Sequence, residues 1–364
     1  ENAQEFLPDS AAGADYSYVH VVRFYGNYTG RYYIWCKITN FDSKLESMDA
    51  KKIEIVRYEP SMKRMWDEFA AASRQGTFLL QRGYMDYHAD RFEDCSLVAM
   101  RGGRVCALLP ANREGDEMWS HRGLTYGGWL TPVSGFDASV MLDVWDAALD
   151  FLRADGAKAL HYKAIPWIYA RCGAEDDVYG LFRLGAQMET CQISSTVDLQ
   201  APLGFDQNSR RNLRKAVAAG LTVEESDNFG AFWDVLGRVL TSRHGVGPVH
   251  SLAEMELLAS RFPQNIRLFT VKNPKGDVLA GTVIYVCGHV AHAQYIAASD
   301  AGCAVGALPM LFSAVMERFA ACCRFFDFGI STERGGQLLN AGLLRQKSGF
   351  GGRGVCYTSY RLTL

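Results

Sequence analysis

Two short segments with the alternation of a β-strand carry polar side chains that could move a proton. In residues 290–299, which read VAHAQYIAAS, a period of two places His292 and Gln294 on one face. The opposite face would carry residues that pack against a core: Ala291, Ala293, Tyr295 and Ala297. His292 could serve as a general base with Gln294 as an orienting group. The alternative, a core histidine with satisfied hydrogen bonds, stays open.

The second segment, residues 324–332, reads RFFDFGIST and places Asp327 and Ser331 on one face. The other face is apolar and would be buried: Phe326, Phe328 and Ile330. Asp327 could accept a proton or orient an acceptor amine. Alternatively, it is a buried carboxylate that pairs with Arg345 or Lys347 to hold the last helix, because an unpaired buried charge is unfavourable.

A lysine near the end of a short helix is a third candidate for chemistry. Lys347 is followed by a glycine-rich run, GFGG, over residues 349–352. It could meet an anionic oxygen while the glycines allow close backbone approach. The alternative is a solvated cation favoured by the helix dipole. We assign Arg345 and Phe350 to the substrate site, Phe350 as a packing anchor rather than a catalytic group.

Four cations crowd one side of a helix expected over residues 208–220. They stand at positions i, i+1, i+4 and i+5: Arg210, Arg211, Arg214 and Lys215. Leu213 and Val217 would supply the apolar stripe of this helix. The four positive charges repel one another, because the expected helix contains no carboxylate. This unfavourable repulsion suggests a polyanion nearby, such as the phosphates of CoA, of a nucleotide sugar or of a tRNA acceptor stem. A solvated helix face is the alternative.

Composition limits the kind of protein that holds these residues. The chain has 364 residues, of which 48% are hydrophobic and 21% charged, as in a globular protein, and the length suggests two domains. With 38 Lys and Arg against 40 Asp and Glu, no global charge attracts nucleic acid or an anionic membrane. The most apolar stretch, residues 304–316, is too short to span a membrane and contains Pro309.

Cysteine and histidine usage predicts a cytoplasmic protein without a metal. The 10 cysteines are scattered, form no CxxC pair, and are expected to be reduced and mostly buried thiols. The 8 histidines lack ligand spacing to them. The closest pair, His289 and His292, would point to opposite faces of a strand.

The order of expected elements repeats along the chain. Residues 48–200 predict the order β, α, α, β, β, β, α, β, α, β, in which Asp137 can cap a helix over 138–156. A similar order returns over residues 207–364, so we expect two α+β domains. Residues 1–47 have no clear period and end just before Met48, which we interpret as a natural start. The alternative for this extension is a short hairpin attached to the first domain.

Three of these stretches resemble the GNAT superfamily, and within it the tandem-GNAT proteins related to the Fem peptidoglycan peptidyltransferases. They are FDFGIST, LLRQKSGFGGRGV and SRRNLRKAVAAGLTV. The resemblance covers about residues 48–364 and implies two tandem GNAT-like domains. It also implies that the strands over 290–299 and 325–332 splay apart around an acyl donor, and that acyl transfer goes to an amine. Lys347 matches the Fem lysine that contacts the donor or the transition state.

The main departure from the family lies in the donor loop. Acetyl-CoA-using GNAT enzymes carry Q/R-x-x-G-x-G/A, whereas residues 299–309 read SDAGCAVGALP and lack the Q/R. Gly302 and Gly306 leave room for a degenerate phosphate loop, although Asp300 adds an unfavourable charge. The corresponding GFDAS of the first domain looks unable to hold CoA, so we assign donor and active site to the second domain.

Three functions remain open at this stage. The first is an N-acyltransferase that acylates an amino sugar or another cell-envelope amine from an acyl-CoA. The second is a Fem-like aminoacyl-tRNA-dependent peptidyltransferase, which the absence of an extended charged heptad run and of a basic net charge weakens. The third is a non-catalytic binding protein on a tandem-GNAT scaffold.

Overall fold

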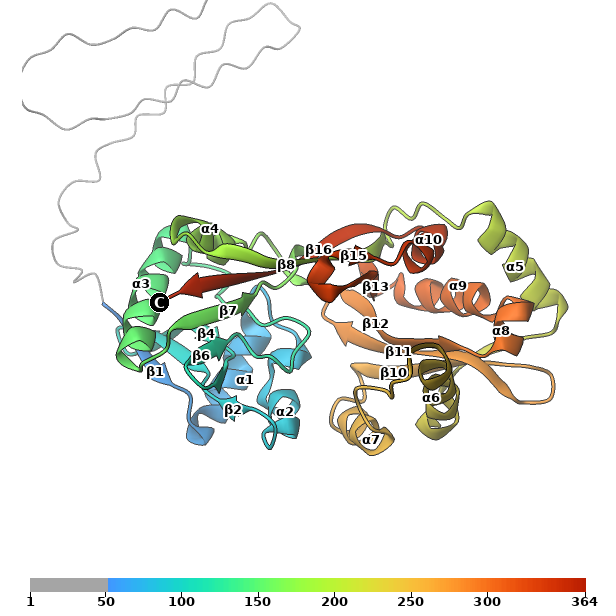
Figure 1. Ribbon diagram of the computed structural model, residues 1–364, viewed down its shortest axis with the longest axis horizontal. Coiled ribbons are helices and arrows are strands. Elements are labelled where there is room, and N and C mark those ends of the chain that lie inside the picture. The colour runs from blue at the N-terminus through green and yellow to red at the C-terminus, as the bar shows by residue number, and fades with distance from the viewer. Residues whose placement is uncertain (1–51) are drawn as a thin grey trace, which may run out of the picture. The chain divides into compact units, whose positions relative to one another are not determined.

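The computed structural model describes residues 52–364, which belong to one compact unit over residues 50–364 (Figure 1). Residues 1–47, with both interpretations of the N-terminal extension, lie outside the described residues. We call residues 52–200 the first half and residues 207–364 the second half. The proposed domain boundaries coincide with these halves and stay a prediction.

A long mixed sheet runs through both halves in the order β2-β5-β6-β7-β16-β8-β13-β12-β11-β10-β9. Its strands are β2 (Glu93–Asp94), β5 (Asn112–Glu114), β6 (Glu117–Trp119), β7 (Ala159–Lys163), β8 (Gln187–Asp198), β9 (Thr222–Ser226), β10 (Ile266–Lys272), β11 (Val278–Cys287), β12 (Val290–Ala298), β13 (Phe325–Ile330) and β16 (Arg353–Thr363). Two small sheets accompany it, one of β1 (Ile53–Arg57), β3 (Leu97–Arg101) and β4 (Arg104–Leu109), the other of β14 (Thr332–Glu333) and β15 (Leu338–Leu339).

The last strand joins the halves. Residues 359–363 of β16 pair with β7, and residues 353–361 pair with β8, so a strand of the second half lies between two strands of the first. In turn, β8 pairs with β13 of the second half. The repeat of element order predicted two units, but it did not predict this exchange.

The helices pack against the long sheet, against the small sheet of β1, β3 and β4, and against one another. They are α1 (Lys63–Ala72), α2 (Arg82–Met85), α3 (Ala138–Ala154), α4 (Asp176–Arg183), α5 (Gln207–Ala218), α6 (Phe229–His244), α7 (Leu252–Arg261), α8 (Asp300–Val305), α9 (Ala307–Phe319) and α10 (Ala341–Gly349). Short 3-10 helices are η2 (Pro60–Met62), η3 (Phe78–Leu80), η4 (Asp86–His88), η5 (Trp167–Tyr169) and η6 (Arg334–Gly336). As predicted, Asp137 caps α3, and its carboxylate accepts from the N–H groups of Ser139 and Val140. In the described part of the chain, no helix is long and apolar enough to cross a membrane.

Three apolar cores stabilise this arrangement. One lies under α3 and α4 in the first half, and another under α5 and α9 in the second. The third contains residues of both halves, such as Trp66 and Tyr84 of the first and Phe232 and Tyr285 of the second. Because both halves bury apolar surface in this shared core, the hydrophobic effect holds them together.

The described cysteines are nine free thiols, but only three of them are buried: Cys95, Cys287 and Cys323. Five are exposed, so the expectation of mostly buried thiols is wrong: Cys172, Cys191, Cys303, Cys322 and Cys356. The apolar character of a cysteine predicts burial on average, but it does not determine whether a given thiol lies on the buried or the exposed face of its element.

Candidate active site

The two predicted strands lie side by side and then separate. The parallel pairing of β12 with β13 covers three residues of each strand and ends where His292 lies opposite Asp327. Beyond this point β12 continues to Ala298 and β13 to Ile330 without pairing to each other. The expected splay is therefore present, and it brings His292 and Asp327 together at the point of separation.

Asp327 is fully buried and accepts hydrogen bonds from side chains of three strands. Its Oδ1 accepts from Ser194 Oγ at 2.5 Å and from Thr196 Oγ1 at 2.7 Å, both on β8. Its Oδ2 accepts from His292 Nδ1 at 2.8 Å and from Tyr357 OH of β16 at 2.8 Å. The carboxylate thus has four close donors.

A second tyrosine completes this network from the first half. The hydroxyl of Tyr169, at the end of η5, lies 2.8 Å from Tyr357 OH and 3.2 Å from His292 Nδ1. It is also 3.4 Å from Asp327 Oδ2. Burial raises the pKa of both phenols well above its ordinary value, so both hydroxyls keep their protons.

The hydrogen bonds decide the charge of Asp327. Burial by itself would raise the pKa of this carboxyl, but the hydrogen bond from His292 and those from the hydroxyls of Ser194 and Thr196 hold it below its ordinary value. Asp327 is therefore an ionised carboxylate. Its partner is His292, so the expected pairing with Arg345 or Lys347 is wrong. Arg345 is exposed on α10.

Lys347 is buried, with 5% of its surface exposed, so it is not a solvated cation. Its Nζ donates to the carbonyl oxygens of Gly329 at 2.8 Å and Ile330 at 2.6 Å, both at the end of β13. Burial lowers the pKa of Lys347 to about 8, although the negative charge of Asp327 acts in the opposite direction. Lys347 ties α10 to the strand that carries Asp327.

A bulge in β13 exposes these carbonyl groups to Lys347. The strand has one extra residue between Asp327 and Ile330 relative to β8, and Gly329 adopts a positive φ of 75°. Phe326 and Phe328 face the core under α9 as expected. Ile330 is 37% exposed, so its predicted place on the buried face is wrong, because the bulge breaks the alternation.

A second bulge lies in β12. Strand β11 pairs with Ala293 and with Tyr295 but skips Gln294, which is half-buried. Ala291 and Ala293 pack in the core under α9, whereas Tyr295 and Ala297 pack in the core shared by the two halves. The prediction that these four residues share one face is wrong, because the extra residue reverses the alternation after Gln294.

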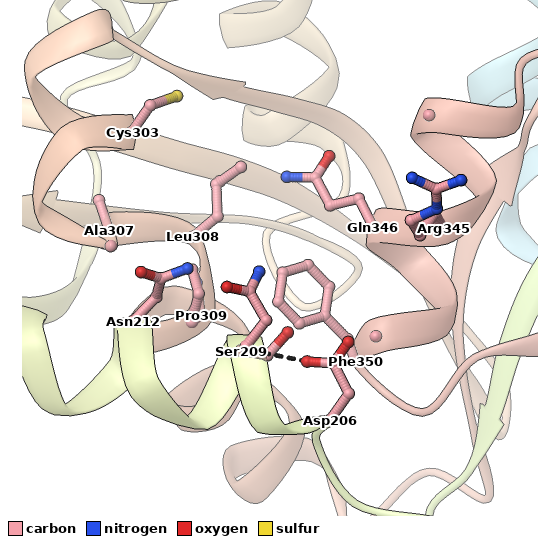
Figure 2. A pocket seen from close by; sticks show the side chains of 14 residues that line it. Asp206, Ser209, Asn212, Cys303, Ala307, Leu308, Pro309, Arg345, Gln346 and Phe350 are labelled. Carbon is pink, nitrogen blue, oxygen red and sulfur yellow. Dashed lines mark hydrogen bonds between the residues drawn. The ribbon is translucent and has the colours of Figure 1, made fainter.

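A pocket of about 610 Å³ lies between α5, the start of α9 and α10 (Figure 2). Its lining combines polar side chains with small and apolar ones: Asp206, Asn208, Ser209, Asn212, Cys303, Gly306, Ala307, Leu308, Pro309, Gly342, Arg345, Gln346, Gly349 and Phe350. Phe350 is buried, and its ring packs against Phe312 and Phe328 of the core under α9. Helix α10 thus carries both Lys347 and one wall of the pocket.

The expected phosphate loop is a helix instead. Residues 300–305 form α8, capped by Ser299, and Gly306 with a φ of 80° leads into α9. A Cβ on Gly302 would lie 2.5 Å from Leu279 O, and one on Gly306 would lie 2.2 Å from Asn212 O. These glycines therefore allow close helix packing, and Gly306 alone borders the pocket.

The four cations of α5 are all exposed, and the pocket lining does not include them: Arg210, Arg211, Arg214 and Lys215. Arg211 donates to Asn208 Oδ1 at 3.0 Å, and Asn208 lines the pocket. Val217 is 61% exposed, so the expected apolar stripe is wrong at that position. The residues of α5 that are buried are Ser209 and Ala216.

Sequence reasoning missed four partners of Asp327: Ser194, Thr196, Tyr169 and Tyr357. They stand at distances of 30 to 158 positions from Asp327 along the chain. The alternation of Ser194 and Thr196 in β8 could have indicated a polar strand face. No local signal points to the two tyrosines, because the fold alone brings η5 and β16 to β13.

Residues 205–334 match the family model of an acetyltransferase (GNAT) domain. No curated protein matches the chain by sequence. Among solved structures the chain is similar to FemX, with a TM-score of 0.62 and 14% identity over 85% of this chain and 97% of that one. It is also similar to L-PGS from Bacillus licheniformis, with a TM-score of 0.55 and 12% identity over 84% and 92% of the two chains.

At these identities the likeness concerns the fold. The predicted α+β class with a tandem GNAT-like fold is confirmed, as is the resemblance to Fem-like proteins at the level of the fold. The matched acetyltransferase segment contains all of β12 and β13, the two strands that separate, and so includes His292 and Asp327.

Proposed function

We propose that the chain is an N-acyltransferase that transfers an acyl group from an acyl-CoA to an amine. The observation that carries this proposal is the pair of His292 and Asp327, joined at 2.8 Å where β12 and β13 separate. An ionised carboxylate that orients a histidine is a recurrent arrangement for a general base. The match of residues 205–334 to a GNAT acetyltransferase domain supports the same chemistry.

The donor is assigned to the pocket beside α9. The N–H groups of Ala307 and Leu308, in the first turn of this helix, have no partner within the helix and favour an anionic group such as a pyrophosphate. Arg345 adds a positive charge to the lining. Helix α10 lines the pocket and is joined to the end of β13 through Lys347. The acyl end of the donor is proposed to extend from the pocket along α10 toward the separated strands.

In the proposed reaction, His292 removes a proton from the acceptor amine through Nε2, since Nδ1 is bound to Asp327. The amine nitrogen then forms a bond to the acyl carbon, and the bond from that carbon to the CoA sulfur breaks. The CoA thiolate takes up the proton. Lys347, with a pKa of about 8, keeps its positive charge at neutral pH and stabilises the oxyanion that develops. Gln294 orients the acceptor at the bulge of β12.

The acceptor is proposed to be an amino sugar or another amine precursor of the cell envelope. This assignment rests on the Fem-like fold. We also propose that the reaction takes place in the cytoplasm, where the nine described thiols would stay reduced.

One observation favours an aminoacyl-tRNA as the alternative donor. The four exposed cations of α5 form no ion pair with any carboxylate of residues 52–364 at 4.0 Å or less. Such an uncompensated cluster would bind a phosphate backbone. The formal charge of −2 for the chain makes this the second choice.

Isothermal titration with CoA and short acyl-CoAs tests the donor assignment. We expect micromolar dissociation constants, about −8 kcal/mol of binding free energy. Leu308→Trp should weaken binding tenfold or more, because this side chain points into the pocket and the larger indole would occupy part of the space that the donor needs (Figure 2). Leu257→Trp is the matched control, since Leu257 is 43% exposed on α7 and does not line the pocket.

Two results would refute the donor assignment. One is that no acyl-CoA binds the folded protein, and the other is that Leu308→Trp leaves the affinity for acyl-CoA unchanged. Aminoacyl-tRNA would be titrated next, with glutamine at the four cationic positions of α5. Loss of tRNA affinity in that variant would establish the alternative donor. Binding of neither donor would indicate a scaffold without transferase activity.

A further inference from the structure

We propose that Tyr169 and Tyr357 are positioning residues that hold His292 in one tautomer, with its proton on Nδ1 and the lone pair on Nε2. This inference rests on the proposed function, in which Nε2 is the base. It assigns the first half a part in the chemistry, because Tyr169 belongs to η5 of that half. Its basis is the placement of protons in the network around Asp327.

The protons can be assigned from Asp327 outward. An ionised carboxylate only accepts hydrogen bonds, so the hydroxyls of Ser194 and Thr196 donate to Oδ1. Tyr357 OH, 2.8 Å from Oδ2, donates its single proton to that oxygen. Oδ2 has two further contacts, His292 Nδ1 at 2.8 Å and the longer one to Tyr169 OH at 3.4 Å.

This assignment also fixes which tyrosine is the donor in the hydrogen bond between the two phenols. Because Tyr357 has given its proton to Asp327, its oxygen can only accept in the 2.8 Å contact with Tyr169. Tyr169 is therefore the donor, and it has no second proton to offer. Its oxygen faces His292 Nδ1 at 3.2 Å as an acceptor.

His292 Nδ1 thus faces two acceptor oxygens, the carboxylate of Asp327 and the phenol of Tyr169. A proton on Nδ1 satisfies both of them. The opposite tautomer would place the lone pair of Nδ1 against a carboxylate at 2.8 Å, in a buried site where the repulsion between them is strong. The network therefore leaves Nε2 unprotonated whenever the imidazole is neutral.

The directions of these hydrogen bonds also explain why two tyrosines are needed to hold the tautomer of His292. Without the hydroxyl of Tyr357, the proton of Tyr169 would be free to turn toward Oδ2 of Asp327 at 3.4 Å or toward Nδ1 at 3.2 Å, and in the second orientation it would stabilise the other tautomer. Without Tyr169, the hydroxyl of Tyr357 would lose the donor of its hydrogen bond, and His292 Nδ1 would lose one of its two acceptors. The charge of Asp327 also acts on Lys347, but the Nζ of Lys347 is bound to the carbonyl oxygens of β13.

Nitrogen NMR of the whole protein labelled with ¹⁵N-histidine tests this assignment. The His292 ring signals are identified by their loss in His292→Gln. We expect a protonated Nδ1 and an unprotonated Nε2 in the natural protein at alkaline pH. Tyr357→Phe should produce a measurable fraction of the Nε2–H form, and Tyr169→Phe should shift the Nδ1 signal.

Tyr295→Phe is the matched control. Tyr295 lies in the same shared core, but its hydroxyl contacts His250 Nδ1 at 2.5 Å, so the signals of His250 should change and those of His292 should not. An Nε2–H tautomer of His292 in the natural protein would overturn the inference, whatever the variants do. Signals of His292 that neither tyrosine substitution moves would overturn it as well. Because no substrate is present, the spectra judge the tautomer independently of whether the protein transfers acyl groups.

Discussion

At the scale of single residues, two buried carboxyls of this protein differ in pKa because their hydrogen-bond donors differ. Asp177, at the start of α4, accepts from Tyr162 OH and from the N–H of Val178. Burial raises its pKa to about 6, and the hydrogen bond from Tyr162 does not offset this. Asp327 has four close donors and keeps a pKa below its ordinary value.

Asp177 should therefore make folding stability depend on pH. A carboxyl whose pKa is raised by folding stabilises the folded state below its unfolded pKa, and this contribution is lost as pH rises through about 6. Relative to Asp177→Asn, the natural protein should lose about 3 kcal/mol of unfolding free energy in total across that window. Urea denaturation of both proteins between pH 4 and pH 7 measures the difference. A difference that stays constant with pH would contradict a raised pKa.

The sequence pointed to several residues of the site but not to their partners. His292, Asp327 and Lys347 stood out because charged or titratable groups in apolar strands and beside glycines are unusual. The partner of Asp327 was predicted wrongly, since Arg345 and Lys347 follow it closely along the chain whereas His292 becomes its neighbour only through the parallel pairing of β12 and β13. Tyr169 and Tyr357 carry no local signal at all.

At the scale of elements, the glycine before α9 is predicted to serve helix packing. Gly306→Ala would force a Cβ to within 2.2 Å of Asn212 O, at a φ of 80° that is unfavourable for alanine. We expect the substitution to lower the unfolding free energy by about 2 kcal/mol or more, because strain and displacement of α5 act together. Thermal unfolding measures the loss.

Gly237→Ala provides the contrast. Gly237 lies inside α6, has no positive φ, and a Cβ there would meet nothing within 4 Å. This substitution should be neutral or stabilise the protein by up to about 1 kcal/mol. If Gly306→Ala proved as harmless as Gly237→Ala, the close packing of α5 on the start of α9 would be refuted.

Most elements could be predicted, but their irregularities could not. Periodicity gave α3 with its Asp137 cap and the strands β12 and β13. Periodicity failed at Gln294 and Gly329. A single extra residue in a strand moves every later side chain to the opposite face of the sheet, and the sequence pattern does not reveal this residue. The glycine spacing before α9 resembled a loop, and only the contact of each glycine with a neighbouring backbone explains the helix.

At the scale of the whole molecule, the halves should be unable to fold separately. Residues 48–200 lack β16, which lies between β7 and β8, and residues 207–364 lack β8, which covers β13. Each half also exposes its side of the shared core when it is alone. We expect neither fragment to show a cooperative thermal transition, and we expect co-expression of both to restore one.

Circular dichroism of the two fragments and of residues 48–364 measures this dependence. A cooperative transition in either fragment alone would contradict it and would support independent domains. The repeat of element order could predict two similar halves, but not the exchange of β16, since a strand's sequence pattern does not record which strands lie beside it.

The central claim, acyl transfer from CoA to an amine with His292 as the base, is tested most directly by amine-dependent release of CoA thiol. The protein is incubated with acyl-CoA and a panel of amino sugars and other amines, and the thiol is measured with a colorimetric reagent. We expect release that requires the amine and that falls about 100-fold or more in His292→Gln. His161→Gln should keep the natural rate, since His161 is a buried histidine held by Glu117 and Glu189 in the first half. Equal rates in His292→Gln and the natural protein, or no amine-dependent release from a protein that binds acyl-CoA, would contradict the claim.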